Sequence, residues 1–365
     1  MNKAEYKNLI TFHPGYYLKE LIEEMQITQD EFAKRLGTTG KNLSELLNGK
    51  TKLSDELAMN LSIMLGTSVD VWLNLQKTYD KKIIEIEYNK RMDKEAETIP
   101  LIDYTFFVVN KFTQVGITTK DKAIELLKFL GITSFDSLKR PNYLVKHRAT
   151  INSTEEKHIL NSNIWVQTAL NVSGNIKTDV YNSKKLKDHL QEIRSMTLQM
   201  PVDFLPRLEA IFSSCGIAFV ILPYLKNSQI YGAVKWVDKD RVILILNDRG
   251  KSADTFWFSL FHEIGHVLQE KLTMLIIDSK DTNLDEINKT LEDEADKFAQ
   301  NILIPKEKYR NFINNGNYSR LAIIQFAIEI GIHPGIVVGR MQKEKYIEYK
   351  SLNNLKQKCT INSKY

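Results

Sequence analysis

Residues 261–269 read FHEIGHVLQ, and this stretch constrains the chain more than any other. On a helix, His262 and His266 project from one face a single turn apart, so both imidazole nitrogens can reach one Zn²⁺ ion at about 2.0–2.1 Å. Glu263 follows the first histidine and would lie beside the metal, where a carboxylate can take a proton from an attacking water. The stretch therefore predicts a helix that carries the reactive part of a zinc site.

The alternative is a pair of partly exposed histidines on an ordinary amphipathic helix. An HExxH string arises by chance in a chain this long with a probability on the order of one in a hundred. A catalytic zinc site also needs a third protein ligand and an open position for water. The motif alone is therefore not proof of a metal site.

A second expected helix, in LEDEADKFAQNILIP, offers the third ligand. Glu292 and Asp296 are four residues apart on one face, and Ala295 and Ala299 continue that face. Two carboxylates among small residues are unusual for a solvated surface. They are explained if Glu292 completes a His₂Glu site and Asp296 accepts the other ring N–H of a ligand histidine.

Residues 12 to about 80 contain five short helices separated by tight turns, which predicts a compact all-α domain. Within it, TQDEFAKRLG and GKNLSELLNG have helix-turn-helix spacing, so the second helix would enter the major groove of DNA. The candidate DNA contacts are Thr39, Lys41, Asn42, Ser44 and Glu45 for base edges, and Gln29, Lys50 and Lys52 for phosphates. The many acidic residues leave open a helical interaction domain with a merely solvated polar face.

Residues 200–310, through FWFSLFHEIGHVLQ and EDEADKFAQNILIP, resemble the ImmA/IrrE-type metallopeptidases. The second motif of that family, E-x-x-A-N/D-x-F-A before a hydrophobic run and a proline, is matched by Glu292, Ala295, Asp296, Phe298, Ala299 and Pro305. The resemblance implies that His262, His266 and Glu292 bind Zn²⁺ and that Glu263 is the catalytic carboxylate. It also implies an endopeptidase that cuts proteins, often repressors of stress or mobile-element genes.

Residues 12–80 resemble the antidote (HigA-type) branch of Xre-like regulators. The resemblance rests on the His-Pro-Gly entry at 13–15 and on the WLNLQKTY segment at 72–79. It implies a homodimer through the N-terminal domain, operator DNA as a partner, often a toxin as well, and a structural role for His13. Gly40 and Glu45 depart from the pattern and leave the operator sequence open.

Two functions remain open at this point. The first is a DNA-binding, antitoxin-like transcriptional regulator with a zinc endopeptidase domain that hydrolyses a repressor, a toxin or itself. The second is a non-catalytic antitoxin or repressor whose zinc domain serves as a sensor or binds a partner. Glu263 favours the first, because a purely structural zinc site has no use for a base there. A broad digestive protease fits poorly with a DNA-binding head.

The substrate site is less well defined by the sequence. An extended peptide could lie along an exposed strand edge, and VILILND is the best candidate. Tyr231, His333 and Arg340 are candidate oxyanion stabilisers, although each is more often a structural or surface residue.

Composition narrows the setting. No run reaches the roughly 18 apolar residues of a membrane-spanning helix, and the N-terminus lacks the apolar stretch of a secretory signal. Cys215 and Cys359 give no disulfide framework. We therefore expect a cytoplasmic protein without a membrane partner. The net charge of +5 is only weak support for a nucleic-acid partner.

From about residue 217 the helical spacing of apolar residues gives way to runs rich in β-branched and aromatic residues. The runs AFVILP, YGAVKWV and DRVILILND are therefore predicted to be strands. The fold class that we predict is α+β and mostly helical. The expected parts are an all-α helix-turn-helix domain over 1–80, a charged linker and helical connector over 81–200, a zincin-like metallopeptidase domain with a small β-sheet and the HExxH helix over 201–345, and a basic tail over 346–365.

Overall fold

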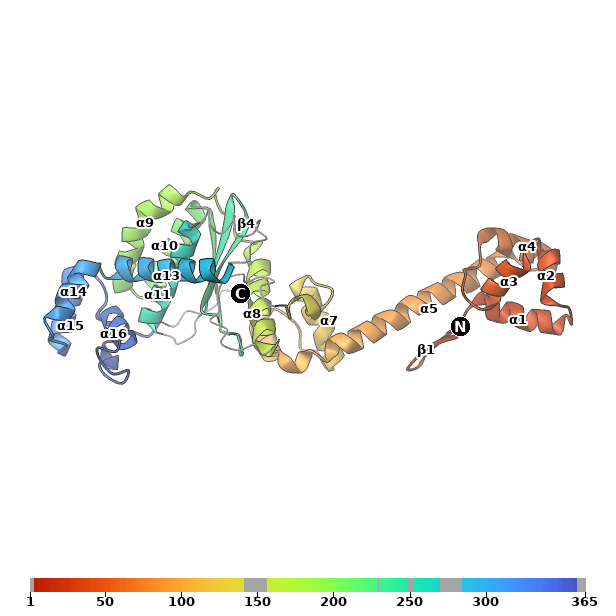
Figure 1. Cartoon of the computed structure of the whole chain (residues 1–365), viewed down its shortest axis with the longest axis horizontal. Helices are drawn as coiled ribbons and strands as arrows, with labels where there is room; N and C mark the ends of the chain where they lie inside the picture. The colour runs from red at the N-terminus through yellow and green to blue at the C-terminus, as the bar shows by residue number, and fades with distance from the viewer. Residues whose placement is uncertain (1–2, 141–155, 229, 248–251, 270–283, 360–365) are drawn as a thin grey trace. The chain divides into compact units, whose positions relative to one another are not determined.

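The computed structural model describes residues 3–140, 156–228, 230–247, 252–269 and 284–359. It divides into two compact units. Unit 1 comprises Met1–Thr98 and Thr118–Ala123, and unit 2 comprises Ile99–Ile117 and Ile124–Tyr365. The prediction of a mostly helical α+β chain is confirmed (Figure 1). The end of the expected basic tail, 360–365, lies outside the described residues.

Unit 1 begins with a β-hairpin and continues as a small helical domain. Its elements are β1 (Lys3–Tyr6), β2 (Leu9–Phe12), α1 (Pro14–Glu24), α2 (Gln29–Leu36), α3 (Gly40–Leu47), α4 (Asp55–Leu65) and α5 (Val69–Ala96). Leu18, Phe32, Leu43 and Leu61 are fully buried in the core between the helices. The short antiparallel hairpin, with Lys7 at a positive φ of 54° in its turn, is not anticipated by the sequence pattern.

Helices α2, α3 and α4 of unit 1 begin at residues whose side chains cap the first turn. The hydroxyl groups of Thr28, Thr39 and Ser54 accept backbone N–H groups of the first turns of α2, α3 and α4. Gly37, with a φ of 74°, ends α2 in the left-handed conformation that glycine adopts without strain. The Glu31 carboxylate in the first turn of α2 pairs with Arg35 at 2.9 Å.

Helix α5 is one continuous helix of 28 residues. Residues 81–96, expected as a charged linker or a solvated helix, continue it because they contain no glycine or proline and are rich in good helix formers. Unit 1 therefore extends beyond residue 80, where we expected the first domain to end.

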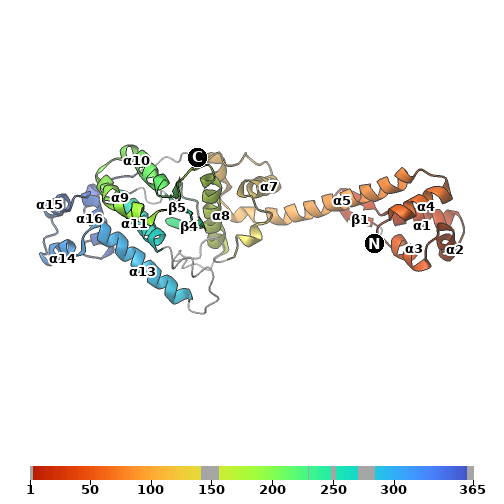
Figure 2. The same cartoon turned by 90° about the horizontal axis from the view of Figure 1, so that it is seen from above.

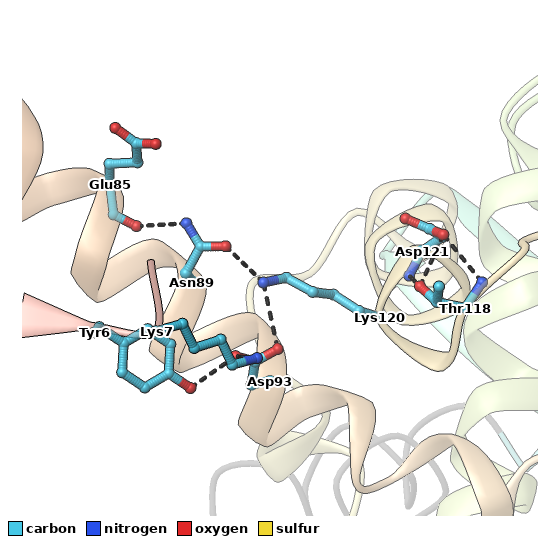
Figure 3. A network of polar contacts seen from close by, with 8 residues as sticks. All are labelled: Tyr6, Lys7, Glu85, Asn89, Asp93, Thr118, Lys120 and Asp121. Atoms are coloured by element: carbon cyan, nitrogen blue, oxygen red, sulfur yellow. Dashed lines mark hydrogen bonds and ion pairs between the residues drawn. The ribbon is translucent and has the colours of Figure 1, made fainter. Parts of the chain in front are cut away.

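Asp93 of α5 collects polar contacts from two other segments of unit 1 (Figure 3). Tyr6 Oη and Lys7 Nζ donate to its Oδ2 at 2.7 and 2.6 Å. Lys120 Nζ lies 3.3 Å from Oδ1 and also donates to Asn89 Oδ1 at 2.6 Å. Hydrogen bonds from Lys7 and Tyr6 lower the pKa of Asp93 to about 2. The carboxylate thus ties the hairpin and the start of α7 to the long helix.

Unit 2 surrounds a small sheet with helices. Its elements are η1 (Ile99–Leu101), α6 (Tyr104–Val109), η2 (Phe135–Ser137), α8 (Glu156–Ser173), α9 (Ser183–Ser195), η3 (Met196–Leu198), α10 (Pro201–Ser214), β3 (Ile217–Leu222), β4 (Gly232–Asp238), β5 (Arg241–Asn247), α11 (Ala253–Leu268), α13 (Leu284–Leu303), α14 (Lys306–Asn314), α15 (Arg320–Ile330), α16 (Pro334–Lys343) and η4 (Asn353–Leu355). Helix α7 (Thr119–Leu130) contributes its first turn to unit 1 and the rest to unit 2.

The sheet has the order β3-β5-β4, in which β3 pairs with β5 in parallel and β4 pairs with β5 antiparallel. Helix α8 lies on one side of the sheet, and α10 and α11 lie on the other (Figures 1 and 2). Both faces of β5 are buried, which explains its unbroken run of aliphatic residues. The prediction that VILILND offers an exposed edge is therefore wrong, because β5 is paired on both sides.

Among the described helices, none is by itself long and apolar enough to span a membrane. Helices α15 and α16, bent by 114° relative to each other, meet the length and composition criterion only as a pair.

Candidate metal centre and DNA-binding helices

Helix α11 carries His262, Glu263 and His266 beside the sheet. Trp257, Leu260, Phe261 and Ile264 are buried in the core of unit 2 and hold the helix in place. The N-cap of α11 is Ser252. The carboxylate of Asp254, in the first turn, contacts Lys356 Nζ at 2.7 Å.

The side chains of His262, His266 and Glu292 meet between α11 and α13, with donor atoms that all lie within 4.8 Å of one another. The two Nε2 atoms are 3.2 Å apart, and the Glu292 carboxylate oxygens lie 3.7 Å from His262 Nε2 and 3.6 Å from His266 Nε2. Ligand atoms about 2.0–2.1 Å from a tetrahedral zinc ion lie about 3.3–3.4 Å apart. The three side chains therefore fit a single metal ion.

The close crossing of α11 and α13 brings Glu292 within reach of the histidines. A Cβ added at Gly265 would lie 3.2 Å from Ala295 Cα and 3.3 Å from Phe298 Cδ1. Gly265 therefore permits the close packing of α11 against α13. Arg194 further fixes the end of α13, because its guanidinium donates to the carbonyl of Ile302 at 2.7 Å.

Each histidine has a partner for its second ring nitrogen. His262 Nδ1 lies 2.6 Å from Asp296 Oδ1, and His266 Nδ1 lies 2.8 Å from Gln269 Oε1. Such partners fix the ring orientation and leave the Nε2 lone pairs for a metal. Gln269 is absent from the sequence prediction, although its position three residues after His266 in FHEIGHVLQ could have indicated it.

Glu263 is 1% exposed and packs against the backbone of Gly232 on β4. A Cβ added at Gly232 would lie only 2.7 Å from Glu263 Oε1. The glycine therefore determines where the carboxylate sits. The sequence offers no local signal for this contact, because the two residues belong to different elements.

His262, Glu263, Glu292 and Asp296 line one cavity of about 790 Å³, whose wall also includes Tyr231, Ser259 and Arg340. His333, by contrast, is the N-cap of α16, and its Nδ1 accepts from Gly335 N at 3.1 Å. Arg340 pairs with Glu344 at 2.9 Å. Among the suggested oxyanion stabilisers, Tyr231 and Arg340 reach the cavity and His333 does not line it.

The predicted DNA contacts gather at α2, α3 and the turn after α3. Gln29 is the first residue of α2, and Thr39 is the N-cap of α3. The exposure of the set falls into two groups: Gln29, Thr39, Lys41, Asn42, Lys50 and Lys52 are exposed, and Ser44 and Glu45 are half-buried. Lys52 already pairs with Asp80 at 2.7 Å, so its charge is partly compensated within unit 1.

Gly40 has a packing role. A Cβ at Gly40 would lie 2.8 Å from Asp30 Oδ1, so a glycine lets this carboxylate approach the start of α3. His13 caps α1 through its Nδ1, which accepts from Gly15 N at 3.0 Å, and its ring lies edge-on to Tyr79 at 4.9 Å. His13 therefore has a structural role, as the resemblance implied: it caps α1 and packs against Tyr79.

Two family models match the chain. The model of the IrrE N-terminal-like domain, a peptidase M78 family, matches residues 216–337, and the helix-turn-helix model matches residues 18–72.

Curated relatives match the N-terminal part alone. The uncharacterised HTH-type transcriptional regulator YddM of Escherichia coli is 31% identical over 83 residues, which are 22% of this chain and 88% of YddM. The uncharacterised regulator YbaQ of the same organism is 34% identical over 85 residues, which are 23% of this chain and 74% of YbaQ.

Solved structures match the same part. An antidote protein of a plasmid maintenance system from Nostoc punctiforme is 25% identical, with 23% of this chain and 92% of that chain covered and a TM-score of 0.23. A HigA-family addiction module antidote from Coxiella burnetii is 32% identical with the same coverage and a TM-score of 0.21. The predicted fusion of two domain types is confirmed by the family models: the chain belongs to the HTH-type transcriptional regulators through its N-terminal part and continues into an IrrE N-terminal-like domain of the M78 peptidase family.

Proposed function

We propose that this protein is a DNA-binding transcriptional regulator whose second domain is a zinc-dependent endopeptidase. Its substrate would be a regulatory protein, such as a repressor, a toxin or the chain itself. The observation that carries the proposal is the meeting of His262, His266 and Glu292 beside a cavity that is lined by His262, Glu292 and Glu263.

The donor set suits zinc, which binds imidazole nitrogens and carboxylate oxygens in catalytic sites of three protein ligands. When bound, zinc would polarise a peptide carbonyl and lower the pKa of a coordinated water. Asp296 and Gln269 keep the two ligand imidazoles in the required orientation.

Glu263 would perform the proton transfers. Its carboxylate takes a proton from the attacking water and passes it to the departing amine as the peptide bond breaks. Packing against Gly232 keeps the carboxylate at the cavity wall and at a fixed place relative to the histidines. Such positioning matters because small misplacements of a catalytic group are costly.

A substrate segment would lie along β4 rather than β5. Strand β4 is at the edge of the three-stranded sheet, and Gly232 at its start lines the cavity together with Ile230 and Tyr231. An extended peptide can add to such an edge through main-chain hydrogen bonds. This arrangement would bring a peptide carbonyl to the metal side of the cavity.

The Glu263→Gln variant tests the enzymatic part. Purified wild-type and variant proteins are incubated with the products of neighbouring genes, and bound zinc is measured in parallel. We expect equal zinc content and no cleavage by the variant, with Glu307→Gln, an exposed change on α14, as the control. Cleavage by Glu263→Gln at the wild-type rate would contradict the role of the base. Zinc binding without any cleavage would favour a sensor or partner-binding domain instead.

The DNA-binding part is tested with the promoter of the protein's own gene. We expect a specific shift that is lost when Lys41 and Asn42 are both replaced by alanine, because both are exposed at the start of α3. Replacing Asn74 and Lys77 on α5 by alanine is the matched control. Equal binding to unrelated DNA would contradict specific readout. If the protein is a homodimer, as expected, its operator should contain two half-sites about 34–36 Å apart. The cytoplasmic location stays a prediction.

A further inference from the structure

Three cationic side chains from the C-terminal part of the chain line the cavity, and two of them are neutralised there. Arg340 pairs with Glu344 at 2.9 Å and stacks on the ring of Tyr309. Lys356 Nζ lies 2.7 Å from the carboxylate of Asp254. Both cations therefore stabilise the cavity wall and are not available for a substrate charge.

Lys343 is the third cation, and its surroundings are different. Its side chain is exposed, and among the described residues no carboxylate forms an ion pair with it. Its Nζ instead lies 4.5 Å from the centroid of the Phe258 ring, a distance at which a cation is attracted to an aromatic face. The Phe258 ring is 6.1 Å from the ring of His262. One aromatic ring is thus close to both the lysine and a metal-ligand candidate.

Lys343 is the last residue of α16, and positive charge is favourable near a helix C-terminus, which explains why a cation is found there. This does not explain why the ammonium lies over Phe258 and faces the cavity. Together the two ring distances set an upper limit on the separation of the Lys343 ammonium from the His262 ring, equal to about three residues of extended peptide at ~3.3 Å per residue. The ammonium is therefore within reach of a substrate side chain up to about three residues from a peptide bond held at His262.

We propose that Lys343 selects substrates with an acidic side chain within about three residues of the bond to be cleaved. The inference rests on the proposed peptidase function and adds a substrate class to it. The acidic groups Glu263, Glu292 and Asp296 occupy the metal side of the cavity, so a substrate carboxylate is directed toward Lys343 and away from them. The apolar residues Ile304 and Ile336 in the same wall favour a peptide over a small free anion.

The test uses a pool of short peptides with randomised sequences and the full-length, zinc-loaded Glu263→Gln protein, which should bind without cutting. We sequence the peptides that are retained by this parent protein and by two versions of it that carry the additional change Lys343→Met or Lys343→Glu. We expect Asp and Glu to be enriched roughly fivefold by the parent protein, as for a partly solvated ion pair. The enrichment should disappear with Lys343→Met, which keeps an aliphatic side chain over Phe258, and should change to Lys and Arg with Lys343→Glu.

Lys345→Glu is the control, because it makes the same charge change two residues away at an exposed position outside the cavity wall. An acidic preference that survives Lys343→Glu would overturn the inference, and so would the absence of any retained peptide. The cleaved sites of the wild-type protein separate the two proposals. Cleavage without acidic preference contradicts only the role of Lys343, whereas retention of acidic peptides without cleavage contradicts only the peptidase function.

Discussion

His262 Nδ1 lies 2.6 Å from Asp296 Oδ1, and this contact joins the two helices that supply the candidate metal ligands. It orients the imidazole from a different helix, whereas His266 is oriented by Gln269 of its own helix segment. The two candidate ligands are therefore contacted from different segments. Asp296 belongs to α13, whereas Gln269 follows α11 and its Nε2 in turn donates to the carbonyl of Leu291 on α13 at 3.0 Å.

Replacing Asp296 by alanine should weaken zinc binding by roughly 10- to 100-fold, because an outer partner fixes the tautomer and the direction of its histidine. Competition with a zinc-binding dye measures the affinity directly. Asp293→Ala is the matched control, since Asp293 is exposed on the same helix. An unchanged affinity in Asp296→Ala would show that the contact has no part in metal binding.

Replacing Gly232 by alanine should reduce peptide cleavage by roughly 100-fold, because the new Cβ would displace the Glu263 carboxylate. Zinc content should remain unchanged, since none of the three ligand candidates is touched. Steady-state kinetics and metal analysis of the same preparation measure both quantities. Equal losses of zinc and of activity would mean that the substitution disturbs the whole site and not the base alone.

His13 and His333 should make the protein less stable in mild acid. Burial lowers the pKa of each imidazole, and each Nδ1 accepts a backbone N–H at the start of a helix. A folded-state pKa below the unfolded value of about 6.5 means that the stabilisation is present above that pH and is lost as the pH falls below it.

Urea unfolding at about pH 7.5 and 5.5 measures this effect. Asparagine can also cap a helix but does not titrate, so His13→Asn and His333→Asn should each reduce the pH dependence of the free energy of unfolding. Comparison with the wild-type chain cancels the contribution of the histidines at the metal centre. A pH dependence identical in all three proteins would contradict the prediction.

Replacing Asp93 by asparagine should loosen the N-terminal hairpin, because Tyr6, Lys7 and Lys120 lose their shared carboxylate. Hydrogen exchange of the β1 and β2 amides should accelerate by roughly fivefold, the size expected for a solvent-accessible ion pair. Glu87→Gln, on an exposed position of α5, is the control.

The pH dependence of the Asp93 network gives an independent check. Because its pKa is lowered to about 2, the stabilisation is present above the unfolded value of about 3.9 and is lost as the pH falls toward 2. Exchange in the hairpin that is insensitive to this acid range, after correction for the intrinsic rate, would mean that Asp93 does not hold it.

The helix starts at Thr28 and Ser54 can be read from local sequence patterns, because a cap involves residues only two or three positions apart. The same patterns did not predict the β1–β2 hairpin or the continuation of α5 through residue 96. A strand of four residues is too short to show a clear alternation of apolar and polar residues. A highly charged helix without an apolar stripe resembles a linker in sequence.

By itself the sequence determined the face of α11 that carries His262 and His266, since the helical period relates residues four apart whatever surrounds them. It likewise placed Glu292 and Asp296 on one face of α13. Only the tertiary structure decided the distance between these faces, through the close approach of Gly265 to Ala295. It also decided that β5 is the central strand, that Gly232 lies under Glu263 and that Lys343 lies over Phe258. Such relationships join segments far apart in the chain, and they depend on packing that no local pattern encodes.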